Sequence, residues 1–169
     1  MLRGETVSSS GRFGFRDARL ALRPAEHVEF WIGASARPAI DRAARLADGF
    51  LASPSLTLDE ARDQAAFYLE RCKAHGRTPR AVAIRRDIYV GESVPDADEV
   101  TARVLAAGYR GIPAAALVAG SVESVVERFA ELAALGYTDV IVRHLTNDQA
   151  KVLGSLTRLG KVRKALASV

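Results

Sequence analysis

The chain has 169 residues, of which 49% are hydrophobic and 26% charged, and its formal net charge is +4. This length and composition suit one ordinary globular domain. No apolar run approaches the roughly 18 residues needed to span a bilayer, and the first residues lack the apolar core of a signal peptide, so we expect a cytoplasmic protein and no membrane segment.

Charge and cysteine content argue against several further classes of function. The basic residues are spread along the chain with acidic residues between them, which disfavours binding to nucleic acid. Three scattered histidines and one cysteine give no ligand spacing, so we expect no metal site. Cys72 falls on the apolar face of a predicted helix and is expected only to pack there. No glycine-rich fingerprint of a P-loop or a dinucleotide-binding fold is present.

The first regular elements follow an irregular opening, residues 1–28. "EFWIGA" is a short apolar strand, and Ser35 is placed to cap the helix that follows it. That helix has one apolar face, made by Ile40, Ala43, Ala44 and Ala47. A second strand, "DGFLAS", leads to a capping box of Thr57 and Glu60, which begins a helix that ends at Gly76.

The second half of the chain continues the alternation. A third strand, "AVAIRRDIYVG", is interrupted by charged residues, and a helix from about Asp96 follows it. A looser stretch over 106–121 leads to Ser121, which caps a helix ending at Gly136. The strand "DVIVRHL" precedes a last helix that starts at a capping box of Thr146 and Gln149. Five residues of this helix are expected to point inward: Leu153, Leu156, Leu159, Val162 and Leu166.

These strands are apolar almost throughout and are separated by helices. This pattern predicts an α/β fold with a parallel sheet buried on both faces, built from four strand-helix units. Periodicity alone leaves open whether the sheet is an open doubly wound one or part of a (β/α) barrel, because both are built from the same right-handed units.

Two blocks of the sequence carry a family resemblance. In "FWIGASARPAIDRAARLADGFLASP" a strand ending in glycine and serine leads into an alanine-rich helix and then "ADGF", and "GSVESVVERFAELAALGYTDVIVRHL" places a capped helix before a strand. They resemble the middle and the end of luciferase-like monooxygenases, which are flavin- or deazaflavin-dependent oxidoreductases. The opening is similar to the family's connection between its fourth and fifth strands. The resemblance therefore implies a partial (β/α)8 TIM barrel, in which 1–169 is a single domain equivalent to strands five to eight and Met1 falls inside the helix after strand four.

The resemblance also implies where a cofactor binds. Ligands of a barrel lie where its strands end and its helices begin. At Gly33, Ala34, Ser35 and Ala36, a helix N-terminus offers unpaired N–H groups beside a small residue and a hydroxyl, and in the family this segment contacts the cofactor phosphate. An ordinary helix cap is the alternative. Ser53 would face the same rim, unless it is only a loop serine.

Charged residues in two strands are further candidates. Arg85 and Arg86 interrupt an apolar strand, so at least one should meet an acidic ligand at the barrel mouth, the side chain of Asp87, or solvent. In a complete barrel Arg143 would pair with a phosphate or carboxylate, and His144 is the one catalytic candidate, as a hydrogen-bond donor or proton carrier. A strand-end capping role is the alternative for both.

The function implied is half of a luciferase-like oxidoreductase, acting by hydride transfer or monooxygenation. It would bind FMN or the deazaflavin coenzyme F420 with a small organic substrate, and it would be active only when completed by another half, either in a homo-oligomer or as a complementary half-barrel. Whether this chain by itself is an enzyme stays open. One alternative is a non-catalytic remnant or truncated interaction domain without cofactor, and another is a binder of small anions or nucleic acid.

Overall fold

The computed structural model describes residues 4–167 and divides the chain into two compact units, Met1–Phe30 and Trp31–Val169. In the first unit, β1 (Val7–Ser9) and β2 (Phe15–Ala18) pair as an antiparallel hairpin. The backbone N–H of Asp17 donates to Ser8 Oγ at 2.9 Å across this pair. The sequence predicts no strand here because these short strands are held by polar contacts and have no alternating apolar pattern.

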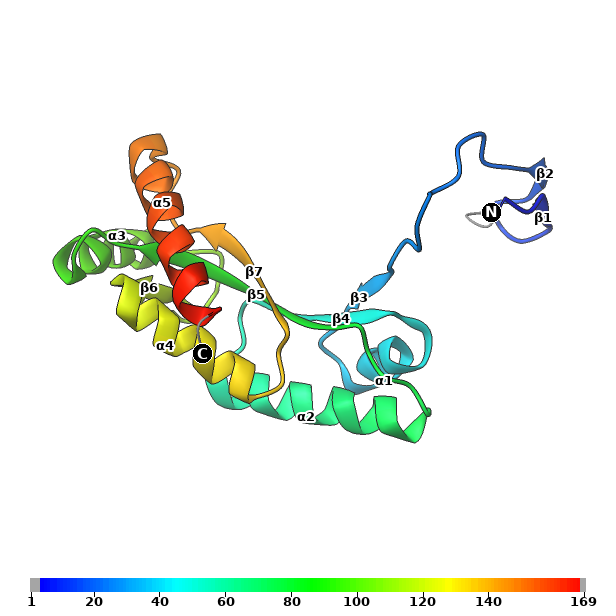
Figure 1. Ribbon diagram of the computed structural model, residues 1–169, viewed down its shortest axis with the longest axis horizontal. Helices are drawn as coiled ribbons and strands as arrows, with labels where there is room; N and C mark the ends of the chain where they lie inside the picture. The colour runs from blue at the N-terminus through cyan, green and yellow to red at the C-terminus, as the bar shows by residue number, and fades with distance from the viewer. Residues whose placement is uncertain (1–3, 168–169) are drawn as a thin grey trace. The chain divides into compact units, whose positions relative to one another are not determined.

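The second unit is a parallel sheet whose strands alternate with helices (Figure 1). Every strand pair in this sheet is parallel. The α/β fold, like part of a TIM barrel, is therefore confirmed. In chain order the elements are β3 (Trp31–Gly33), α1 (Arg37–Leu46), β4 (Gly49–Ala52), α2 (Leu58–Ala74), β5 (Ala81–Val90), α3 (Val94–Ala106), the 3-10 turn η1 (Ala114–Ala116), β6 (Val118–Gly120), α4 (Val122–Ala134), β7 (Asp139–His144) and α5 (Gln149–Leu166).

Strand β5 is the centre of the sheet. Ala83 and Ile84 pair with β4 and also with β7, so β4 and β7 lie on opposite sides of β5. The order β3, β4, β5, β7 is that of four consecutive units of a barrel. The short strand β6 pairs only with the last three residues of β5. It lies in the stretch for which the sequence predicts no strand, because three residues are too few to show a period.

Two of the predicted N-caps are confirmed by a hydrogen bond from the backbone of the first helical turn to the capping side chain. Thr57 and Glu60 form the expected capping box of α2, and Ser121 caps α4. Helix α2 ends at the left-handed Gly76, as predicted.

Two predicted caps are wrong. Helix α1 starts after Ala36 without any side-chain cap, so Ser35 does not cap it. Helix α5 starts after Asp148, whose carboxylate accepts the N–H of Lys151 at 3.0 Å, instead of at Thr146. Aspartate is as good an N-cap as serine or threonine, so for α5 both Thr146 and Asp148 fitted the sequence pattern of a helix start.

The main core lies between the sheet and its helices. Helix α1 contributes Ile40, Ala43 and Ala44, and α2 contributes Ala61, Ala65, Tyr68 and Cys72. The ring of Tyr68 stacks on Phe50 of β4 with 4.7 Å between centroids. Cys72 is buried in this cluster, and burial raises the pKa of its thiol. The small residues of α1 and α2 let the helices approach the sheet closely.

Helix α5 packs differently from its prediction. Among the five residues expected inside, Val162 is fully buried and Leu159 and Leu166 are partly buried against the core, as predicted, whereas Leu153 and Leu156 are 55% and 53% exposed. The helix instead turns Ser155 towards the end of β5, where Ser155 Oγ accepts the N–H of Val90 at 2.9 Å. Arg158 Nε donates to the carbonyl of the same residue at 2.8 Å. These two side chains therefore bond to the N–H and the carbonyl of Val90, the groups to which a neighbouring strand would otherwise bond.

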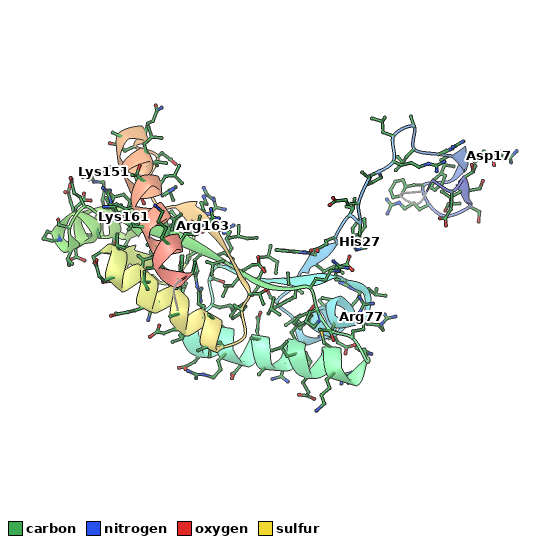
Figure 2. All side chains as sticks on the ribbon, viewed as in Figure 1. Asp17, His27, Arg77, Lys151, Lys161 and Arg163 are labelled. Atoms are coloured by element: carbon green, nitrogen blue, oxygen red, sulfur yellow. The ribbon has the colours of Figure 1, made fainter. Side chains whose placement is uncertain are left out.

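An ion pair joins the start of α5 to α3. Lys151, labelled in Figure 2, brings Nζ to 2.6 Å from Asp96 Oδ1. Asp96 also accepts bonds from Tyr89 Oη at 2.9 Å and from the N–H of Glu92 at 3.0 Å. The bond from Lys151, followed by that from the Glu92 N–H, lowers the pKa of Asp96 to about 2.

A Ser155→Ala substitution is expected to destabilise the protein by about 1–3 kcal/mol, because it leaves the buried N–H of Val90 without an acceptor. Urea unfolding followed by circular dichroism measures this loss. The control is Thr157→Ala, because that hydroxyl is exposed and bonds only to a carbonyl of its own helix. Equal losses in the two variants would contradict the role of Ser155.

The ion pair of Asp96 is expected to lose its contribution to the free energy of unfolding in acid. The folded pKa of Asp96 lies below its unfolded value of about 3.9, so its contribution is complete above pH 4 and is lost as the pH falls towards 2. The unfolding free energies of wild type and Asp96→Asn should therefore differ at pH 7 and converge near pH 2. Asp98→Asn, a change at an exposed residue of the same helix, should leave the free energy nearly unchanged at each pH. A difference for Asp96→Asn that stays constant down to pH 2 would refute the prediction.

Candidate functional site

The two faces of β5 have different chemistry. Val82, Ile84 and Ile88 point into the core under the helices. The residues between them, which include Arg85 and Asp87, therefore lie on the opposite face, because successive side chains of a strand alternate. In a closed barrel this face lines the interior, so we call it the inner face.

A cavity of about 330 Å³ opens where β3 and β4 end. Ligands of barrel proteins gather at this end of the strands. The cavity brings together five residues that the sequence singles out, Gly33, Ala34, Ser35, Ser53 and Arg85, whereas the predicted Ala36 is not part of the lining. Its remaining lining is Leu51, Ala52 and Pro54.

The cavity borders the uncapped start of α1. The backbone N–H groups of Ser35 and Ala36 have no hydrogen-bond acceptor within residues 4–167, and the first turn of α1 has no acidic side chain. The N–H of Ala34 donates to the carbonyl of Leu51 at 3.3 Å and fixes the loop to β4. A helix start with free N–H groups carries about half a positive charge, which favours an anionic oxygen.

Small residues and hydroxyl groups leave room for a ligand here. A Cβ added at Gly33 would meet only the carbonyl of Leu51, at 3.8 Å. Ser53 Oγ lies 2.9 Å from Ser55 Oγ, so this pair holds the β4–α2 loop and still presents a hydroxyl to the cavity. The polar side chains of the lining are therefore two serines and one arginine.

Arg85 is the cation of this cavity, and a buried carboxylate holds it. Its Nε donates to Asp87 Oδ1 at 3.0 Å, and its Nη2 donates to Oδ2 at 3.4 Å. Tyr109 Oη donates to Asp87 Oδ2 at 2.6 Å from the loop after α3. Burial, and then the bond to Asp87, raises the pKa of Tyr109 to about 12. The sequence gives no sign of Tyr109, because nothing local connects that loop to β5.

Arg86 is not brought to the cavity. It is buried on the face towards the helices, where its Nη1 donates to the carbonyls of Leu56 at 2.7 Å and Pro54 at 3.3 Å. Burial lowers the pKa of this guanidinium. Arg86 therefore holds the β4–α2 loop from the face of the sheet towards the helices. Because side chains of a strand alternate between its two faces, the sequence could have shown that Arg85 and Arg86 lie on opposite faces.

Arg143 and His144 are separated in the same way. Arg143 pairs in register with Asp87, so it lies on the inner face, whereas His144 pairs with Ile88 and lies on the face towards the helices. The Nδ1 atom of His144 is buried and has no hydrogen-bond partner within the described part of the chain, and burial lowers the pKa of the ring. The structure thus leaves His144 away from the inner face.

Residues 4–167 contain neither a cluster of metal-ligating side chains nor a membrane-spanning helix. No group of three or more histidine, cysteine, aspartate or glutamate residues is placed to hold a metal ion there. No helix in the same part of the chain is long and apolar enough to cross a membrane.

Comparison with known proteins places the fold. The sequence model of the family described as luciferase-like monooxygenase matches residues 1–116. An F420-dependent secondary alcohol dehydrogenase, solved in complex with an F420-acetone adduct, superposes with a TM-score of 0.74 at 16% identity, over 95% of this chain and 56% of its own. The monooxygenase RslO1 from Streptomyces bottropensis gives 0.75 at 15% identity, over 95% of this chain and 56% of its own. No curated protein sequence matches the chain significantly.

A third solved structure is the coenzyme F420-dependent tetrahydromethanopterin reductase from Methanopyrus kandleri. Its TM-score is 0.64 at 18% identity, over 85% of this chain and 53% of its own. The chain therefore spans little more than half the length of each of these three proteins. At such identities the likeness establishes a shared fold.

Proposed function

This chain belongs to the luciferase-like monooxygenase family, and we propose that it forms the cofactor-phosphate half of a flavin- or deazaflavin-dependent oxidoreductase. The cofactor would be FMN or coenzyme F420, each of which carries a phosphate. The observation that carries the proposal is the cavity at the ends of β3 and β4, where an uncapped helix start meets two serines and an arginine.

The phosphate would take its ligands from two loops and one strand. The N–H of Ser35 and the hydroxyls of Ser35 and Ser53 would supply donors from the lining of the cavity, and the N–H of Ala36, which is not part of that lining, would add one from the next residue. Gly33 leaves space for an oxygen to approach the backbone. Ala34 stands where the family more often has a second glycine, so the approach is slightly narrower than in those relatives.

The inner face would lie under the cofactor ring and the substrate. Trp31 and Ile141 are 36% and 40% exposed on this face, so part of its apolar surface is open to solvent. The bound cofactor would supply hydride transfer or oxygen activation, and the protein would orient the ring and keep water away. That exclusion needs the other wall of the barrel.

A second half-barrel would supply that wall. This chain covers 56% of the length of two of the matched solved structures, and a parallel sheet with edge strands and partly exposed apolar side chains favours association. We propose that the wall comes either from a second copy of this chain or from a complementary half-barrel, and that oxidoreductase activity appears only in the assembled form.

One observation favours an interaction domain without cofactor. Of the two candidates on β7, the histidine faces the helices, so His144 is not placed to move a proton on the inner face near neutral pH. A chain that kept the fold and lost its chemistry would have this arrangement. Titration with cofactor separates the two candidates.

Wild-type protein is expected to bind FMN or F420 with a saturable change in fluorescence, and Gly33→Val should weaken that binding by roughly tenfold or more, because the new side chain fills the phosphate cavity. Light scattering during the titration gives the size of the species that binds. Gly160→Val, on an open stretch of α5, is the control and should bind like wild type.

The outcome that would contradict the proposal is specific. If neither cofactor binds the wild-type chain, alone or mixed with the complementary half of a family member, the chain is not the phosphate half of such an enzyme. If binding occurs but Gly33→Val retains it, the phosphate lies elsewhere.

A further inference from the structure

We propose that Arg85 is the cationic phosphate ligand of this cavity, and that Asp87 and Tyr109 are the residues that position it. The inference rests on the proposed phosphate site and not on which cofactor carries the phosphate. No comparison with known proteins assigns these three residues.

Arg85 has donors left for a ligand. A guanidinium carries five N–H groups, and Asp87 accepts one from Nε and one from Nη2. The remaining groups have no acceptor within residues 4–167, and the side chain, which is 28% exposed, lines the cavity. Two parallel N–H bonds to a carboxylate fix the plane of the guanidinium, so the direction of its free edge is set as well.

Asp87 is held as firmly as the arginine that it orients. Its side chain is fully buried, and a buried carboxylate must be paired to remain charged in the folded protein. Arg85 supplies the charge and Tyr109 Oη a bond of 2.6 Å. Tyr109 lies in a loop 22 residues further along the chain, so a side chain remote in sequence closes the cluster.

This arrangement exceeds what the sheet requires. An apolar pair at these positions of β5 would continue the pattern of Ala81 and Ala83, which are buried on the same face. The chain instead places a paired charge on β5, which β4 separates from β3 and the uncapped start of α1, where free N–H groups already favour an anion. Arginine bonded through one edge and open on the other is well suited to bind phosphate.

The test uses inorganic phosphate as the probe and the amide signals of Ser35 and Ala36 as the readout, in an NMR titration at constant ionic strength. Wild type should show a saturable shift at both amides. Arg85→Gln should weaken the apparent affinity for phosphate by roughly tenfold or more. Arg85→Lys should have an affinity between those of wild type and Arg85→Gln, because lysine keeps the charge but lacks the paired N–H donors of the guanidinium. Arg42→Gln removes the same charge from an exposed site on α1 and should leave the affinity unchanged.

A double-mutant cycle separates positioning from a general effect on the fold. Tyr109→Phe should weaken phosphate binding by about threefold in the wild-type background and have no effect in the Arg85→Gln background, because a positioning residue acts only through its partner. Equal effects in both backgrounds would overturn the positioning role. Affinity in Arg85→Gln equal to that in Arg42→Gln, or no saturable shift in wild type, would overturn the phosphate role of Arg85.

Folding of the variants needs its own control. Arg85→Gln leaves a buried carboxylate without its cation, so the double variant Arg85→Gln/Asp87→Asn, which keeps a neutral hydrogen-bonding pair, is measured beside it. It should also bind phosphate weakly. If the protein binds a cofactor and its affinity for phosphate does not depend on Arg85, this inference is refuted and the proposed function stands. If phosphate binding depends on Arg85 but neither cofactor binds, the inference stands and the proposed function is refuted.

Discussion

The structure depends on the alternation of side chains along β5, the central strand, which pairs with β4, β6 and β7. The face of β5 towards the helices is mainly apolar because residues of four helices pack against it, and Arg86 on this face bonds to loop carbonyls. On the opposite face Asp87 is fully buried, and a buried carboxylate is tolerated only as a paired group. Arg85 and Asp87 meet this condition because their two side chains share one face and bond to each other.

The same alternation explains which parts of the site the sequence could reveal. The corner from Gly33 to Ala36 was found because a loop between strand and helix is local, and its residues are neighbours both in sequence and in space. Arg85 and Arg86, like Arg143 and His144, form consecutive pairs of which only one member can face inward. Their faces follow from the apolar residues on either side: Arg86 shares the parity of Ile84 and Ile88, and His144 shares that of Val142.

Other features could not be predicted because their causes are tertiary. Helix α5 has leucines at helical spacing, and the sequence predicts all of them inside, but near its start Ser155 faces β5 and Leu153 and Leu156 are exposed. Tyr109 reaches Asp87 from a loop without regular structure. The capping box of α2 was predictable because all of its bonds lie within four residues.

The division of the candidate site between local and distant elements bears on what half a barrel can retain. Every group proposed to hold phosphate comes from β3, β4, β5 or their following loops, with Tyr109 as the farthest support, and all of these lie in one compact unit. Under the proposed function, binding of phosphate would need no further strand. Orientation of a ring and exclusion of water would need one, because Trp31 and Ile141 are partly exposed on the inner face. Phosphate binding and catalysis would then be separable, and phosphate affinity by itself would be evidence for the proposed phosphate site and not for an active enzyme.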